Sequence, residues 1–307
     1  MIVDFLASSV PDPESFALTE AVTHARLRGY TEHFRGGVKP ARTHAEVTDR
    51  WKAAREKARD YALTEEKFFA VMKSSGIGLA GVYNESFGSR LGVPGPSNAL
   101  VGDFVRRNSE TVVGFAGIDP WEADAARQVD EAVTDLGFSG IMVSPFKQDL
   151  MPEDPRMARI YGRCEALDVP VLLHTGINWS LDVAYDVGHP RHIDAVARAF
   201  PDLKVVAVHA GWPWVEDMLM VAWRHQHVYL DLSAHRPRTF SRPDSGWGSL
   251  LQLGNRQLAD RVLFATTWPL LGISPADLIA EVRDLPLREE TLEKWLGGNA
   301  LRLLGRG

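Results

Sequence analysis

Short apolar runs alternate with longer segments of helical spacing along most of the chain. Strands that are apolar at nearly every position are typical of a parallel sheet buried on both faces by helices. The pattern therefore predicts an α/β protein. The eight expected strands are Ile2–Leu6, Ile77–Tyr83, Val112–Ile118, Gly140–Ser144, Val169–His174, Leu203–His209, Val228–Leu232 and Arg261–Ala265.

Between these strands, apolar residues recur at helical spacing. The expected helices are Glu122–Leu136, Pro155–Asp168, Pro190–Phe200, Trp214–Trp223, a short one at Asn255–Asp260, and a terminal helix that ends at Gly297–Leu304. Eight strand–helix units close into a (β/α)8 TIM barrel more readily than they form an open sheet, although a doubly wound sheet is the alternative. We expect one barrel domain over residues 1–307, with a long excursion at about 9–60 between the first two strands.

Composition narrows the classes of function. The net charge is −6 and no run of basic residues occurs, so we expect no nucleic-acid partner. No segment approaches the ~18 apolar residues that span a bilayer, and the first residues lack a signal-peptide pattern. We therefore expect a cytoplasmic protein with no membrane partner.

Two histidines end neighbouring predicted strands. His174 ends the fifth strand and His209 the sixth, each followed by small turn residues. Because the carboxyl ends of barrel strands meet at one mouth, where active sites lie, we expect both imidazoles to face one cavity as catalytic residues. Satisfying backbone groups at the barrel rim is the alternative. Asp231, which ends the seventh strand, is a third candidate, either catalytic or a hydrogen-bonding residue that holds neighbouring loops.

Aromatic and polar residues follow several of the predicted strands. Aromatic walls with a few converging polar groups are typical of a small-molecule site. Packing of helices against the barrel is the alternative role for some of the tryptophans. The candidate substrate-binding residues at strand ends are Trp179, Trp212, Trp214, Trp268, Thr267, Tyr83 and Glu85.

Several of these strand ends resemble one known family. The stretches Pro170–Trp179, Phe200–Trp214, Val228–Ser233 and Leu263–Pro269, with Gly298–Ala300, resemble the fifth to eighth strands and terminal helix of the amidohydrolase-2 family. This family includes aminocarboxymuconate-semialdehyde decarboxylase, resorcylate-type decarboxylases and pyrone-dicarboxylate lactonase. The resemblance implies a (β/α)8 barrel of the amidohydrolase type and is clear over about residues 110–304.

The resemblance also implies a metal site that this sequence has mostly lost. The family holds its metal with a His-x-His pair on strand one, a histidine on strand five and an aspartate on strand eight. The corresponding residues are Leu6, Ser8, His174 and Thr267. Only His174 remains a good ligand, so we expect no tightly bound metal. A divalent metal such as zinc at a rearranged site of His174, His209 and Asp231 is the alternative.

The family suggests roles for two further residues. His209 matches its catalytic base on strand six. A first-loop arginine can grip a substrate carboxylate in the family, which makes Arg35 a further candidate substrate-binding residue.

These features predict a metal-poor or metal-independent enzyme that uses histidine acid/base chemistry. The expected substrate is a small activated carbonyl compound, cyclic or enolic, and the expected reaction is that of a lyase, a decarboxylase or a lactone-type hydrolase. One alternative is a non-catalytic protein of this fold that binds a small molecule or an active subunit. The other is a metal-dependent hydrolase or decarboxylase with relocated ligands. The sequence leaves a homodimer open and does not identify the substrate.

Overall fold

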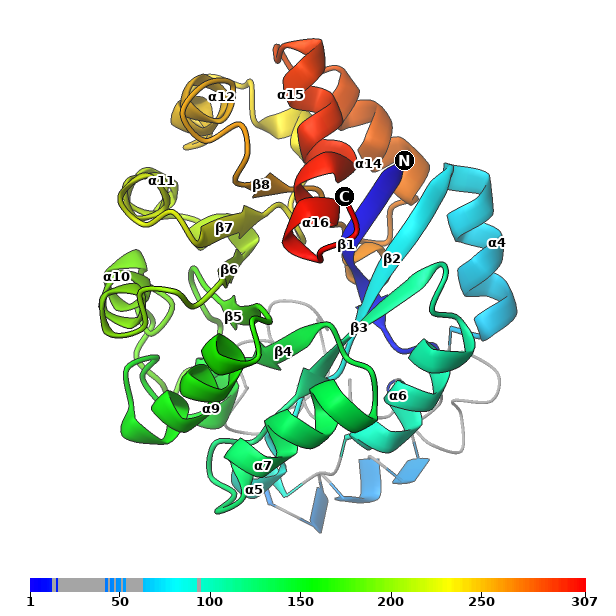
Figure 1. Ribbon diagram of the computed structural model, residues 1–307, viewed down its shortest axis with the longest axis vertical. Helices are drawn as coiled ribbons and strands as arrows, with labels where there is room; N and C mark the ends of the chain where they lie inside the picture. Colours follow the sequence, from blue (N-terminus) through cyan, green and yellow to red (C-terminus); the bar gives the residue numbers. More distant parts are fainter. Residues whose placement is uncertain are drawn as a thin grey trace.

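Eight parallel strands follow one another in chain order around the molecule (Figure 1). The computed structural model describes residues 1–12, 15, 42–43, 45–46, 48–50, 52–53, 63–92 and 95–307. Each strand pairs in parallel with the next. The strands are β1 (Ile2–Ser9), β2 (Ile77–Tyr83), β3 (Val112–Gly117), β4 (Gly140–Val143), β5 (Val171–His174), β6 (Val205–Val208), β7 (Val228–Asp231) and β8 (Val262–Leu263).

Backbone hydrogen bonds also join the end of β8 to β1. The Phe5 N–H donates to the Phe264 carbonyl over 2.9 Å, and the Thr267 N–H donates to the Leu6 carbonyl over 2.8 Å. These bonds nearly close the sheet into a barrel. The predicted (β/α)8 fold is confirmed.

A buried carboxyl strengthens this closing seam. Asp4 on β1 is fully buried and accepts hydrogen bonds from the Thr266 N–H (3.0 Å) and the Thr266 hydroxyl (2.6 Å). Burial raises the pKa of Asp4 to about 7, and the nearby Asp231 adds to the rise. The acid is therefore half protonated near neutral pH, because its buried surroundings disfavour its charged form.

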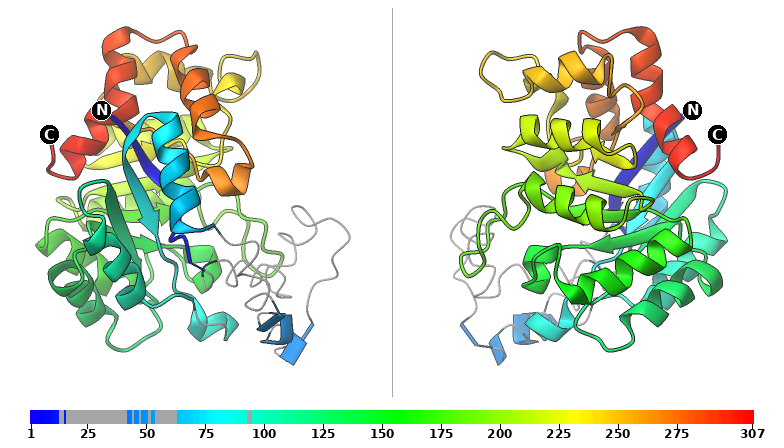
Figure 2. Two further views of the ribbon diagram at one scale, coloured as in Figure 1. Left: turned by 90° about the vertical axis from the view of Figure 1, so that its right-hand side faces the viewer. Right: turned by 60° about the vertical axis from the view of Figure 1, so that its left-hand side comes forward.

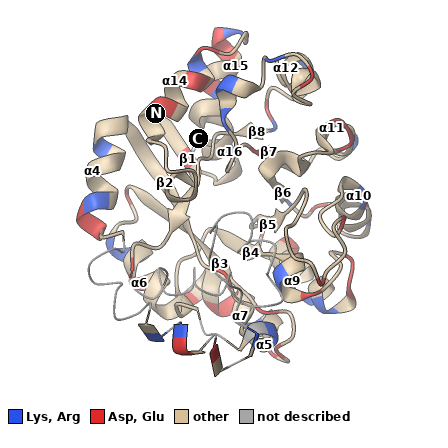
Figure 3. Cartoon of the chain, turned by 180° about the vertical axis from the view of Figure 1, so that it is seen from behind, with Lys and Arg blue, Asp and Glu red and all other residues tan. Residues whose placement is uncertain are grey.

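Helices surround the strands in Figures 1 and 2, and charged residues are concentrated on them in Figure 3. The helices are α4 (Glu65–Ser75), α5 (Gly88–Leu91), α6 (Asn98–Arg107), α7 (Ala125–Asp130), η3 (Glu131–Asp135), α8 (Pro145–Gln148), α9 (Pro155–Ala166), α10 (Pro190–Ala199), η4 (His209–Gly211), α11 (Val215–Arg224), η5 (Pro237–Thr239), α12 (Gly248–Gly254), α13 (Trp268–Leu271), α14 (Pro275–Arg283), α15 (Glu289–Glu293), η6 (Lys294–Gly298) and α16 (Asn299–Leu303). Among the described residues, no helix is long and apolar enough to cross a membrane.

The core has an inner and an outer layer, which explains why the strands are apolar at almost every position. Inside the barrel, Phe5, Phe115 and Leu172 belong to one cluster, and the Phe5 and Phe115 ring centroids lie 4.9 Å apart. Outward-facing residues such as Leu173 and Ala207 belong to a second cluster with the helices. Alternate residues on a strand point to opposite faces, so both faces of each strand lose their contact with water.

Two differences from the predicted elements lie near the closing seam of the barrel. The helix predicted at Asn255–Asp260 is wrong, because that segment forms turns and α12 precedes it. Gly254, at the end of α12, packs so closely on the Trp295 ring that a Cβ atom added to this glycine would lie 2.4 Å from the ring. The eighth strand is shorter than predicted, and just beyond Leu263 the Phe264 N–H donates to the Trp295 carbonyl, outside the sheet. Most of the predicted excursion at 9–60 lies outside the described residues.

Candidate active site

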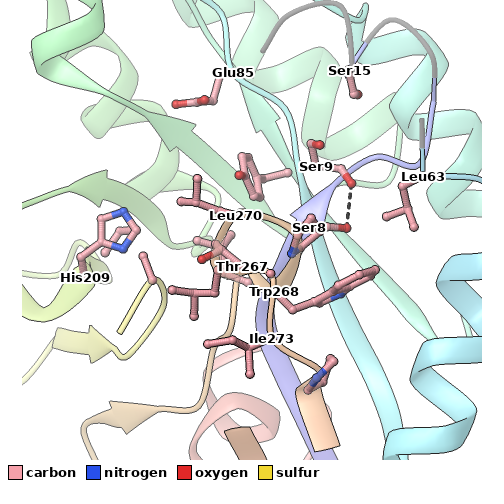
Figure 4. Close-up of a pocket in the computed structure, with 18 of the residues that line it drawn as sticks. Ser8, Ser9, Ser15, Leu63, Glu85, His209, Thr267, Trp268, Leu270 and Ile273 are labelled. Carbon is pink, nitrogen blue, oxygen red and sulfur yellow. Dashed lines mark hydrogen bonds between the residues drawn. The ribbon is translucent and has the colours of Figure 1, made fainter. Parts of the chain in front are cut away.

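A cavity of about 1640 Å³ opens at the carboxyl ends of the strands. Leu6 and Ser8 from β1, Met142 from β4, and His174 from β5 all line it. Thr267 and Trp268 follow β8 and line it too, and Figure 4 shows them with Ser8 and His209 around the opening. The fold therefore brings residues from distant parts of the sequence to one mouth, as parallel barrels do.

Two imidazole rings face this cavity together. The ring centroids of His174 and His209 lie 4.8 Å apart with the planes 78° from parallel, and the His174 ring lies 4.5 Å from that of Phe146. Burial lowers the pKa of His174 well below its usual value, and the neighbouring His209 and Lys147 disfavour its protonation further. Burial also lowers the pKa of His209, against an opposing effect of Asp231. Both rings are therefore neutral near pH 7, the form that can accept a proton.

His209 stands on a backbone turn of unusual conformation. His209, Ala210 and Gly211 all have positive φ angles, of 67°, 49° and 72°. Two of these residues carry a Cβ, which is disfavoured in the left-handed region by about 1–2 kcal/mol each. Such strain persists only where surrounding contacts hold the backbone in place.

Asp231 supplies those contacts from the neighbouring strand. Its Oδ1 accepts hydrogen bonds from the His209 N–H (2.9 Å), the Ser233 N–H (3.0 Å) and the Ser233 hydroxyl (2.5 Å). The His209 Nδ1 lies 3.0 Å from the Ser233 carbonyl oxygen, an acceptor that requires a proton on Nδ1. Nε2 is then the ring nitrogen with a free lone pair.

The structure does not bring Asp231 itself into the cavity, although the sequence made it a candidate catalytic residue. Its side chain is fully buried and is not among the described residues that line the cavity. Burial raises the pKa of this carboxyl and the nearby His209 lowers it. Asp231 therefore holds the His209 backbone from behind the cavity.

The family's metal-binding positions converge as the resemblance implies, but their side chains do not fit a metal. Leu6 has no donor atom. The Ser8 hydroxyl donates to the Ser9 carbonyl over 2.8 Å, the dashed line in Figure 4, and the Thr267 hydroxyl donates to the Thr266 carbonyl over 2.7 Å. Neutral hydroxyls engaged with backbone are poor substitutes for imidazole and carboxylate.

A rearranged metal site is not formed either. The described residues contain no group of three or more His, Cys, Asp or Glu side chains that could hold a metal ion. The proposed combination of His174, His209 and Asp231 fails because the carboxylate is behind His209 and bonded to its N–H. The residues present therefore do not fit a tightly bound metal in the described part of the chain.

A charged pair also lines the cavity, and the sequence analysis identified only one of its two residues. Glu85, which follows β2, accepts hydrogen bonds from Lys147 Nζ (2.6 Å) and from the Ser144 hydroxyl (2.6 Å). Glu85 and Lys147 both line the cavity. Glu85 was a sequence candidate, whereas Lys147 was missed. Its position directly after β4, in α8, was the sequence feature that pointed to the cavity.

Aromatic residues form much of the cavity wall. Tyr83, Trp179, Trp212 and Trp268 line it. Trp214 does not belong to the described lining; its ring lies 4.8 Å from that of His189 and 5.8 Å from that of Tyr185. Arg35 lies outside the described residues.

His235, on the loop after β7, was also not among the residues that the sequence analysis identified. His235 lines the cavity, and its ring lies 5.9 Å from Trp212 and 4.8 Å from Trp247. Its Nε2 is buried without a hydrogen-bond partner among the described residues. Burial lowers the pKa of His235 to about 3, so this ring is neutral at physiological pH.

Comparison with known proteins relates this chain to one family. Residues 40–306 match the family model Amidohydro_2, described as amidohydrolase. The gamma-resorcylate decarboxylase of Rhizobium radiobacter is 25% identical over 225 residues, which cover 59% of this chain and 66% of the relative. The match thus spans just under two thirds of that decarboxylase.

Solved structures extend the likeness over the whole chain. An uncharacterised TIM-barrel protein from Bordetella bronchiseptica is 27% identical, with a TM-score of 0.73 over 99% of this chain and 98% of its own. A dihydroxybenzoic acid decarboxylase from Polaromonas sp. JS666, with bound manganese and the inhibitor 2-nitroresorcinol, is 18% identical. Its TM-score is 0.63 over 99% of this chain and 96% of its own, a likeness in fold.

Proposed function

The chain belongs to the amidohydrolase family, and on that premise we propose that it is a carbon–carbon lyase that releases CO2 from a small cyclic hydroxy acid. The observation that carries the proposal is the pair of neutral imidazoles, His174 and His209, whose ring centroids lie 4.8 Å apart at one cavity. The likeness to gamma-resorcylate decarboxylase suggests 2,6-dihydroxybenzoate, which is γ-resorcylate, as the first substrate to try.

The reaction balances with the side chains present. Nε2 of neutral His209 takes the proton of a ring hydroxyl next to the carboxylate, and the imidazolium then delivers that proton to the ring carbon bearing the carboxylate. The carbon–carbon bond breaks, its electron pair returns to the ring, and CO2 leaves. The resulting phenolate takes a proton from water. An imidazolium of lowered pKa is a strong acid toward carbon, which suits it for the second transfer.

The floor of the cavity favours the departure of CO2. Leu6, Met142 and Val208 line it with apolar surface, and each is nearly or fully buried. A carboxylate held against such a surface is desolvated, whereas the CO2 that forms is uncharged. The environment therefore stabilises the product side relative to the bound acid. We propose that His174 hydrogen-bonds the substrate and that the tryptophans enclose its ring.

We further propose that this reaction needs no tightly bound metal. The Polaromonas enzyme of the same fold contains manganese, but Leu6, Ser8 and Thr267 occupy the implied ligand positions here. The polar groups that line the cavity include imidazoles and the Glu85–Lys147 pair.

The test is turnover of 2,6-dihydroxybenzoate to resorcinol, followed by chromatography. His209→Asn should lower kcat by about 10²–10⁴-fold, as expected for loss of a general acid/base. The matched control is His189→Asn, because His189 packs on Trp214 away from the cavity, and it should retain the wild-type kcat. Equal turnover of the His209 variant and wild type would contradict the proposal.

A further inference from the structure

The Glu85–Lys147 pair is a built feature of the cavity wall. The two side chains are 14% and 17% exposed, and Glu85 Oε2 lies 2.6 Å from Lys147 Nζ. Two aromatic rings hold the ammonium in place, since Nζ lies 5.5 Å from the centroid of Phe87 and 5.7 Å from that of Phe146. An ammonium ordered in this way loses little further freedom when a ligand binds to it.

Lys147 has donor capacity beyond its bond to Glu85. A protonated lysine carries three N–H donors. Within the described part of the chain, Nζ donates one hydrogen bond, to Glu85. Ser144 binds the other carboxylate oxygen, Oε1, of Glu85. The remaining donors are therefore available to an oxygen atom that enters the cavity.

The position of Lys147 relates it to the two histidines. The Phe146 ring lies close to both, because its centroid is 5.7 Å from Nζ and 4.5 Å from that of the His174 ring. The positive charge of Lys147 contributes to the lowered pKa of both His174 and His209. Lys147, His174 and His209 all line the same cavity, so one ligand bound there can contact both the imidazoles and this ammonium.

The chemistry decides which part of a substrate belongs beside this cation. A cation on the departing carboxylate would stabilise the bound acid more than the CO2-like transition state and would slow the reaction. The apolar floor of Leu6, Met142 and Val208 suits that group instead. A ring oxygen, in contrast, keeps or gains negative charge when CO2 leaves, so a cation beside it stabilises the transition state.

We propose that Lys147 is an oxyanion-binding residue that takes the phenolate or enolate oxygen of the substrate in exchange for part of its bond to Glu85. This rests on the proposed function, and it assigns the substrate an ionisable ring hydroxyl in addition to the carboxylate. The two residues of the pair then have opposite effects: Lys147 attracts the oxyanion and Glu85 competes with it.

The probe is 2-nitroresorcinol, which lacks a carboxylate and whose absorption shifts to longer wavelength when its hydroxyl ionises. Titrating the complex by absorbance gives the apparent pKa of the bound ligand without any turnover. In wild type this pKa should lie below that of the free compound. Lys147→Met should raise it by about one unit, and Glu85→Gln should lower it further.

The matched control is Lys204→Met. Lys204 is also a partly buried lysine in an ion pair, 2.7 Å from Asp168 and 23% exposed, but it precedes β6 and lies at the opposite end of the barrel from the cavity. It should leave the ligand pKa at the wild-type value. The same pKa in Lys147→Met and wild type, a rise in Glu85→Gln, or no binding of the probe would overturn the proposal.

A carboxylate role for Lys147 gives a different pattern. Lys147→Met would then weaken binding of 2,6-dihydroxybenzoate and leave the ionisation of bound 2-nitroresorcinol unchanged, which also overturns the proposal. Failure of the proposed function is separate, because it would appear as a normal phenolate shift in a protein that turns over no 2,6-dihydroxybenzoate.

Discussion

The two halves of the barrel mouth carry different chemistry on the same framework. At the β8–β1 half, Leu6 is apolar and the hydroxyls of Ser8 and Thr267 donate to neighbouring carbonyls. At the β5–β7 half, His174 and His209 face the cavity and Asp231 fixes the second of them. Strand ends converge in any such barrel, so convergence alone does not make a site. The side chains at those ends decide whether the mouth can hold a metal or move a proton.

The two buried aspartates repeat this contrast. Asp4 accepts two hydrogen bonds from Thr266 and secures the barrel seam. Asp231 accepts three through one oxygen and secures the turn that carries His209, while its Oδ2 is buried without a partner among the described residues. One carboxyl thus serves the fold and the other serves the site.

The largest expected effect comes from converting the β8–β1 half of the mouth into a metal site. Leu6→His, Ser8→His and Thr267→Asp, made together, would place imidazole and carboxylate ligands beside His174. We expect the triple variant to retain about one zinc ion after dialysis, measured by plasma mass spectrometry, because four such ligands bind zinc tightly. Adding His174→Ala should reduce that retention. A folded triple variant that retains no zinc would show that the two halves differ in more than their ligands.

A smaller effect concerns Asp4 and pH. The pKa of Asp4 is raised from 3.8 to about 7 in the folded protein. The stability contributed by the protonated acid is thus complete below pH 3.8 and is lost as the pH rises through 7. Asn does not titrate. The free energy of unfolding of Asp4→Asn minus that of wild type should therefore rise by up to about 4 kcal/mol as the pH increases from 4 to 8.

Urea unfolding of both proteins at each pH measures this difference. The buried histidines titrate alike in the two proteins, and their opposing contribution, which is lost as the pH falls below 6.5, cancels in the comparison. A difference that stays constant with pH would mean that Asp4 is ionised in the folded protein throughout.

Next in size is the effect of Asp231 on catalysis. Asp231→Asn weakens the acceptor that holds the His209 and Ser233 N–H groups. We expect kcat for 2,6-dihydroxybenzoate to fall by about 10–100-fold with little change in KM, since Asp231 acts through the placement of His209. In the His209→Asn background the same substitution should cost much less. Additive losses would instead indicate that Asp231 acts on the substrate independently.

The smallest effect concerns His235, which lines the cavity after β7. Its Nε2 is buried without a partner within the described residues, and an unsatisfied polar group costs about 1–3 kcal/mol. His235→Phe should therefore raise the free energy of unfolding by about 1 kcal/mol, as measured in urea. Trp247→Phe, at the ring that flanks it, is the control and should lower stability. A loss of stability in His235→Phe would mean that the imidazole makes a stabilising bond.

The barrel was largely predictable from the sequence because its strands are buried on both faces. The predicted bounds of β2 are those observed, and the other predicted strands overlap the observed ones. β8 and α12 were less predictable. Their surroundings include the hydrogen bond from the Phe264 N–H to the Trp295 carbonyl and the contact between Gly254 and Trp295, which join residues far apart in the sequence.

The site was predictable where residues end strands and less so where they lie on loops. His174 and His209 end predicted strands, and the fold places both at the cavity. Trp214 lies three residues beyond the turn of positive φ at His209–Gly211, and no sequence pattern gives the direction of a side chain there. Lys147 and His235 also lie beyond strand ends, where the alternation of faces no longer applies.

Metal content of the active protein is the most direct test of the central claim that this mouth does acid/base chemistry without a tightly bound metal. Untagged protein would be purified without chelators, incubated with zinc or manganese, dialysed, and measured by plasma mass spectrometry alongside its turnover of 2,6-dihydroxybenzoate. The account predicts far less than one metal per chain, with turnover unchanged by chelator treatment. Near-stoichiometric metal whose removal abolishes turnover would contradict it.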